Sequence, residues 1–170
     1  MLSAPEIGAN PPQASGGAER ASPVRKILLA TDLSPTSGPA TNEAFDLAQR
    51  LGAHLLVVSV IDTSAPRLPG ARFAPRVDQV RDRRQASAQE LVQRGRREGV
   101  PVTFLVWEGE PGDSILEAAR AEDADMVILG SHGRGPIGRL ILGSVSQYVA
   151  QHALIPVVVV PRDAEAGAAQ

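Results

Sequence analysis

Short apolar segments alternate with longer amphipathic segments along most of the chain. The apolar runs have the length of strands buried on both faces, and they lie at Lys26–Ala30, His54–Asp62, 102–107, 126–129 and Val157–Val160. Between them, apolar residues recur every three or four positions, which is typical of helices packed on a sheet. Strands separated by helices pair in parallel, so the pattern predicts an α/β fold: a single doubly wound sheet of five parallel strands with helices on both faces.

Local signals predict where the helices begin and end. Ser34 followed by Pro35 predicts a helix start, with the serine as N-cap and the proline at the first helical position, and Gly52 predicts the helix end. Further helices are predicted over 76–98, over Pro111–Ala121 and up to about His152, with a proline-rich loop over 63–75. The alternation does not determine the strand order. We expect 3-2-1-4-5, because the commonest five-stranded arrangements reverse direction beside the first strand.

The ends of the chain differ in composition from its middle. Residues 1–22 and 163–170 show no periodicity and predict disordered tails on either side of one domain over 23–162. There is no apolar run of about 18 residues, no apolar stretch near the N-terminus and no cysteine. The formal net charge of −2 argues against a nucleic-acid-binding protein. We therefore expect a cytoplasmic protein that binds neither membranes nor nucleic acid.

A glycine-rich segment follows the fourth predicted strand. Gly130 and Gly133 come directly off the strand's carboxyl end, and Gly143-Ser144 opens the next helix. Residues without a side chain allow backbone N–H groups to approach an anion, and a helix N-terminus favours negative charge. The segment is therefore a candidate phosphate site, although a loop that merely turns the chain is an equally good interpretation of these residues alone.

The spacing Gly-x2-Gly-x9-Gly-Ser resembles the signature of the ATP-binding branch of the universal stress protein family. The opening Lys26-Ile-Leu-Leu-Ala-Thr-Asp-Leu-Ser34, Val60-Ile-Asp62 and the closing Pro156-Val-Val-Val-Val160 are similar to that family as well. The resemblance covers residues 24 to 161. It implies ATP as the ligand, with Mg²⁺, a regulatory role in the stress response, and a homodimer formed through the last strand.

The resemblance also implies roles for individual residues. Asp32 is similar to the family aspartate that contacts the nucleoside, and Val60 to the residue whose backbone meets adenine. The full set of binding positions implied is Ala30, Thr31, Asp32, Val60, Leu129, Gly130, His132, Gly133, Arg134, Gly143, Ser144 and Val145. Ala30 stands where many relatives carry proline. Arg134 or Arg139 is either a phosphate contact or a solvated surface residue.

An independent geometric expectation joins two of these positions. Asp32 follows the first strand and Gly130 ends the fourth. If the sheet reverses direction between those strands, both residues lie in one crevice at the carboxyl edge, where ligands of doubly wound folds bind.

Other functions agree less well with the residues. Gly133-Arg-Gly-Pro-Ile-Gly138 matches the dinucleotide fingerprint, but it follows the fourth strand and no acidic residue ends the next one. No G-x-x-x-x-G-K-[ST] or G-x-S-x-G motif is present, and we expect no catalytic residue and no dedicated metal site. A slow ATP-hydrolysing or phosphotransfer enzyme and a dimerising scaffold without nucleotide remain as alternatives.

The last strand, Val157–Val160, is short, entirely apolar and expected at a sheet edge. An open apolar edge is an aggregation hazard, and pairing with a second copy would remove it. A cover formed by the C-terminal tail is the alternative.

Overall fold

The computed structural model describes residues 23–63, 73–131 and 142–161, and no side chains for 73–82. Its strands are β1 (Lys26–Ala30), β2 (His54–Asp62), β3 (Val102–Gly109), β4 (Met126–Gly130) and β5 (Val157–Val160). All neighbouring pairs are parallel, and the order is β3-β2-β1-β4-β5. This confirms the predicted fold and strand order.

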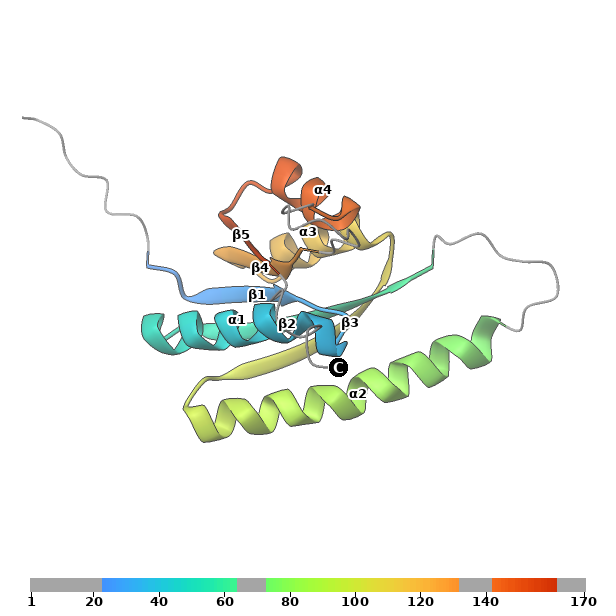
Figure 1. Ribbon diagram of the computed structural model, residues 1–170, viewed down its shortest axis with the longest axis horizontal. Helices are drawn as coiled ribbons and strands as arrows, with labels where there is room; N and C mark the ends of the chain where they lie inside the picture. The colour runs from blue at the N-terminus through green and yellow to red at the C-terminus, as the bar shows by residue number, and fades with distance from the viewer. Residues whose placement is uncertain (1–22, 64–72, 132–141, 162–170) are drawn as a thin grey trace, which may run out of the picture.

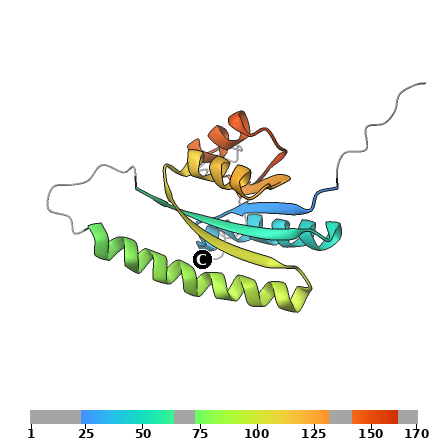
Figure 2. The ribbon, with the colours of Figure 1, turned by 180° about the vertical axis from the view of Figure 1, so that it is seen from behind.

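Helices cover both faces of the sheet (Figures 1 and 2). They are α1 (Gly38–Leu51), α2 (Phe73–Glu98), α3 (Pro111–Ala121) and α4 (Ser144–His152). Helices α1 and α2 pack on one face, and α3 and α4 pack on the other. The chain therefore changes face between the helix that follows β1 and the helix that follows β4.

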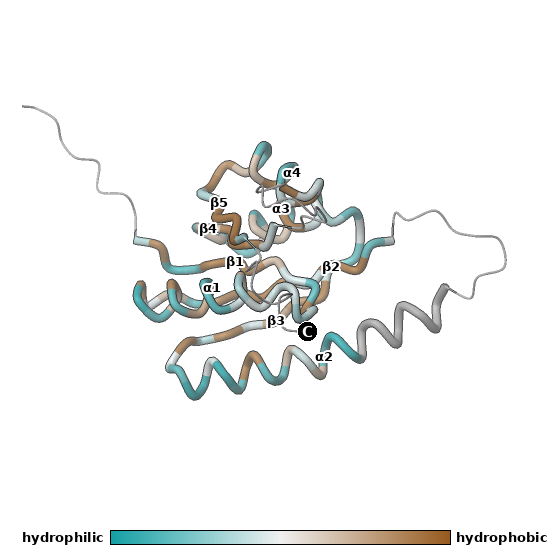
Figure 3. The backbone as a smooth tube through the Cα atoms, in the orientation of Figure 1, coloured by the Kyte–Doolittle hydropathy of each residue, from teal (hydrophilic) through white to brown (hydrophobic). Residues whose placement is uncertain are grey.

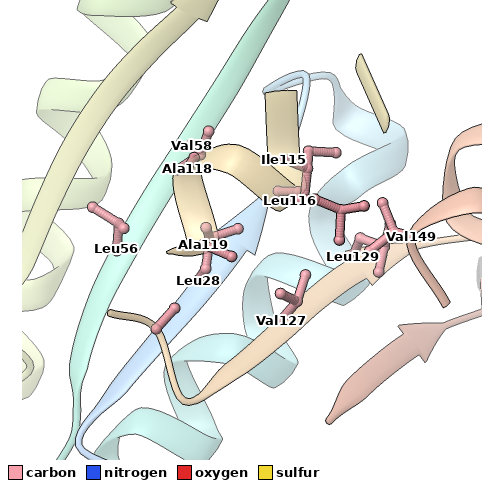
Figure 4. Packing of buried hydrophobic residues seen from close by; sticks show 12 residues of the cluster. Leu28, Leu56, Val58, Ile115, Leu116, Ala118, Ala119, Val127, Leu129 and Val149 are labelled. Atoms are coloured by element: carbon pink, nitrogen blue, oxygen red, sulfur yellow. The ribbon is translucent and has the colours of Figure 1, made fainter. Parts of the chain in front are cut away.

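The central strands supply the core of both layers. Ile27, Leu29 and Val57 point toward α1 and are fully buried, while Leu28, Val58 and Val127 are equally buried on the α3–α4 side. Figure 4 shows this second cluster, in which aliphatic residues of the sheet meet α3 and α4. The strands are accordingly apolar along their length, whereas the described part of α2 is largely polar (Figure 3).

Four element boundaries differ from the sequence prediction, the smallest difference being at β4, which extends one residue further, to Gly130. The first α-helix begins at Gly38, because residues Pro35–Ser37 form a 3₁₀ turn. Ser34 precedes that turn without capping it, since its hydroxyl pairs with Thr36 Oγ1 at 2.8 Å. In addition, α2 begins three residues earlier than predicted and β3 extends two residues further. The predicted stop at Gly52 is confirmed, with the left-handed φ of 63° that favours glycine.

Candidate functional site

The site lies where β1 and β4 end side by side. Ala30 pairs with Leu129 in the sheet register. Beyond this pair, Thr31 N donates to Val58 O of β2 at 3.0 Å, while Ser131 N donates to Val160 O of β5 at 2.8 Å. Helices α1 and α4, which follow β1 and β4 in the chain, pack on opposite faces of the sheet. This separation opens a crevice at the carboxyl edge, as expected for a doubly wound sheet at its switch point.

A cavity of about 330 Å³ occupies this crevice, a volume within the range of small-molecule sites. Most of the binding positions expected from the sequence line it: Ala30, Thr31, Asp32, Val60, Leu129, Gly130, Gly143, Ser144 and Val145. The structure thus brings together residues more than a hundred positions apart. His132, Gly133, Arg134 and Arg139 lie outside the described residues.

The turn after β1 presents Asp32 at the rim of the cavity. Asp32 is exposed, and its Oδ1 accepts a hydrogen bond from Ser34 N at 3.0 Å. Thr31 is buried, accepts from Leu33 N at 3.0 Å and donates to Ser37 Oγ at 2.9 Å. Leu33 has a φ of 60°, a conformation that costs a residue with a side chain about 1–2 kcal/mol. Short polar side chains therefore hold a strained turn that fixes the Asp32 backbone.

The N-terminus of α4 forms the opposite wall. Its first helical hydrogen bond runs from Gln147 N to Gly143 O at 2.9 Å, so the N–H groups of Ser144, Val145 and Ser146 precede the helical ladder. The buried Ser146 hydroxyl also donates to Gly143 O, at 2.9 Å. Gly143 is the N-cap. The cavity is thus bounded by backbone donors and by the positive end of the helix dipole.

The packing around Gly130 and the backbone conformation of Gly143 do not require glycine at these positions. A Cβ added to Gly130 would lie 3.8 Å from Ala40 Cβ, an ordinary contact. Gly143 has φ −66° and ψ 161°, an extended conformation open to any residue. A side chain at Gly143 would therefore not strain the backbone. What a side chain at either position would remove is free space beside the cavity.

The remaining lining was not identified from the sequence. It has a polar part, made of Thr36, Ser37, Ser131 and Ser146, and an apolar part. In the apolar part, Val58 and Ile115 line the cavity together with Pro111 of α3, and Figure 4 shows Ile115 of α3 on the side of Leu129. A flat, weakly polar ring suits such a surface better than a phosphate does. Sequence periodicity marks these residues as core and contains no signal that they also face a cavity.

Helix α3 also fixes the position of α4. Tyr148 of α4 donates to Asp113 Oδ1 at 2.6 Å, which raises the pKa of the tyrosine, and its ring stacks on His152 at 4.2 Å between centroids. The ring lies so close to Gly112 that a Cβ there would come within 2.5 Å of Tyr148 Cδ1. Gly112 and Tyr148 therefore set the distance between the two helices, and so place the α4 N-terminus at the cavity.

Within 23–63, 73–131 and 142–161, no three histidine, aspartate or glutamate side chains are grouped so as to hold a metal ion. No helix in this part of the chain is both long and apolar enough to cross a membrane.

Comparisons with known proteins agree with this architecture. The model of the universal stress protein family matches residues 23–161. A universal stress protein of Thermus aquaticus is 36% identical over 142 residues, covering 80% of this chain and 98% of that protein. One of Mycobacterium tuberculosis is 35% identical over 136 residues, covering 78% of this chain and 44% of that protein, so this chain spans less than half the length of the mycobacterial relative.

Solved structures show the same fold. A universal stress family protein of Burkholderia pseudomallei has a TM-score of 0.69 at 26% identity, covering 83% of this chain and 98% of that one. One of Lactobacillus plantarum has a TM-score of 0.66 at 27% identity, covering 82% and 99%. With the strand order, the cavity and the family match in agreement, the chain belongs to the universal stress protein family.

Proposed function

We propose that this protein binds ATP, with Mg²⁺, in the cavity between β1 and β4, and that it acts in the cytoplasm as a nucleotide-dependent regulator of the stress response. The observation that carries the proposal is the composition of the cavity. An exposed carboxylate and an apolar wall lie at one side, and glycines with a helix N-terminus lie at the other. These two halves have the chemistry that a nucleoside and a polyphosphate require.

The phosphate half is built from backbone groups. The N–H groups at the start of α4, which precede the helical ladder, can donate hydrogen bonds to phosphate oxygens, and Ser144 adds a hydroxyl at the first helical position. Gly130 leaves space beside them on β4. Mg²⁺ would accompany the phosphates, because it binds through phosphate oxygens, water and few protein groups in such sites.

The nucleoside half is built from the ends of β1 and β2. Asp32 offers carboxylate oxygens to ribose hydroxyls, and Val58, Val60 and Ile115 offer an apolar surface to a base. Two solved proteins with this fold, at 24% and 20% identity, are described as complexes with cAMP and dAMP. Those complexes concern other proteins, and the proposal for this chain rests on its own cavity.

A homodimer through β5 is part of the proposal. This strand forms one edge of the sheet, its four valines are half-buried, and Leu154 just before it is 91% exposed. A second β5 would satisfy the open backbone groups and cover this apolar edge.

Nucleotide binding is tested by titrating the purified protein with a fluorescent ATP analogue in Mg²⁺. We expect Gly143→Val to weaken binding at least tenfold, because losing one hydrogen bond to a charged group costs about 1.5–3 kcal/mol. The matched control is Ala150→Val, which adds a branched side chain at an exposed position on the same helix. If Gly143→Val folds normally and binds within about twofold of the wild type, the phosphate site is assigned wrongly.

A further inference from the structure

The carbonyl of Val60 has lost its strand partner at the edge of the cavity. Val58 O accepts from Thr31 N, the last backbone contact between β2 and the chain leaving β1. Carbonyls two residues apart on a strand point to the same side. Val60 O therefore points past the end of β1, toward the place where Asp32 leaves the sheet. A backbone acceptor in this position needs another donor.

Arg84 supplies that donor from the other face of the sheet. It lies on α2, whose helix runs beneath β2 and β3 in Figure 1, and its Nη1 donates to Val60 O. The side chain is partly buried. Burial lowers the pKa of the Arg84 guanidinium, and the negative charge of Asp32 acts in the opposite direction. Arginine stays protonated in proteins, so a cation contacts Val60 O and lies within electrostatic range of Asp32.

A charged donor at Val60 O changes what that edge offers to a base. An adenine 6-amino group needs an acceptor. One of the two lone pairs of this carbonyl is already engaged by the guanidinium, whose positive charge also makes the oxygen a poorer acceptor for a second donor. A purine with an oxygen at C6 needs a donor instead. A guanidinium carries five N–H donors in a planar fork, and the bond to Val60 uses one from Nη1. Arginine paired with the O6 and N7 atoms of a purine is the commonest specific base contact in protein–DNA complexes.

We propose that Arg84 determines base preference in this site, lowering the selectivity for adenine and favouring purine nucleotides with a 6-oxo group. The inference rests on the proposed nucleotide site and goes beyond it, because it assigns a residue on α2 to the choice of base. ATP still binds, since the ribose and phosphate contacts do not depend on Arg84. The expected consequence is that ITP, which has a 6-oxo group and an N1–H where ATP has a 6-amino group and a bare N1, binds the wild type at least as tightly as ATP.

The experiment compares direct titrations of ATP and ITP into the wild type and Arg84→Met. Methionine keeps an unbranched apolar stem and removes all five donors. We expect the ratio Kd(ITP)/Kd(ATP) to rise at least fivefold, because an arginine–base pair contributes about 1–3 kcal/mol of discrimination. Arg83→Met is the matched control: Arg83 is the exposed neighbour on the same helix, and its replacement should leave the ratio unchanged.

The outcomes separate the two proposals. A rise of threefold or more in Arg84→Met, absent from Arg83→Met, supports the role of Arg84. A smaller change, or an equal loss of both nucleotides, overturns it and leaves a role in holding β2 to α2. If the wild type binds neither nucleotide, the nucleotide site itself is wrong and the inference falls with it. Arg84→Gln, which keeps a polar side chain, replaces the methionine variant if the latter does not fold.

Discussion

Adding one methyl group at Gly112 should disturb the site from a distance. The new Cβ of Gly112→Ala would lie 2.5 Å from Tyr148 Cδ1 and 3.1 Å from both Cε1 and Cγ. The ring is also held by the stacked His152 and, at its hydroxyl, by Asp113. It therefore cannot accommodate the methyl group without breaking one of these contacts or moving α4.

The expected cost follows from two opposing terms. Overpacking of this kind costs about 1–3 kcal/mol. In the opposite direction, replacing glycine by alanine in a helix stabilises the folded state by about 0.5–1 kcal/mol. We expect Gly112→Ala to lower the free energy of unfolding by about 1–2 kcal/mol, which shifts the Tm of a chain of this size by about 2–8 °C. The displaced α4 N-terminus should also weaken ATP binding.

A double-mutant cycle, measured by urea unfolding, identifies the cause. In a Tyr148→Ala background the ring is gone, so Gly112→Ala should be neutral or stabilising there. The loss of stability would then depend on Tyr148, as the geometry requires. If Gly112→Ala costs the same free energy with and without the ring, the contact between α3 and α4 does not constrain the site, and this reasoning is refuted.

Two further predictions concern the rest of the molecule. Asp125 Oδ2 accepts from Arg25 N at 2.8 Å and Lys26 N at 2.9 Å, and these bonds lower its pKa. Because the pKa of Asp125 is lower in the folded state, its ionised carboxylate stabilises the fold at pH values above its unfolded-state pKa, near 4. This stabilisation is lost as the pH falls through the folded-state pKa. Asp125→Ala should therefore cost about 1 kcal/mol in urea unfolding at pH 7 and progressively less below about pH 4, and a cost independent of pH would contradict the assignment. For the dimer, β5 bonds to β4 through Pro156 O and Val160 O, so Val159 points its N–H out of the sheet. Val159→Pro should convert a dimer to a monomer in light scattering at micromolar concentration, and a monomeric wild type would disprove the dimer.

The architecture was predictable because the apolar runs, the helical segments between them and the helix-end signals all indicate the same α/β fold. Apolar runs such as residues 126–129 have strand length, and the helical segments between them carry their own stops, as at Gly52. The start of α1 was placed too early because Ser34-Pro35 suits a 3₁₀ turn as well as an α-helix, and the hydrogen bonds of Ser37 decide between them.

The site was predictable only in part. Asp32 and Gly130 follow strands, and the topology alone brings them together. Pro111 and Ile115 were missed because a core residue and a cavity wall have the same apolar pattern. Arg84 was missed for another reason: it acts through the backbone carbonyl of Val60, and a hydrogen bond to a carbonyl leaves no mark on the residue type that accepts it.

Native mass spectrometry of the nucleotide-free protein, mixed with Mg²⁺ and ATP, tests the central claim most directly. The account predicts one ATP per chain at tens of micromolar ATP, and the loss of this adduct in Gly143→Val but not in Ala150→Val. A folded wild-type protein that remains entirely unliganded at millimolar ATP would contradict it.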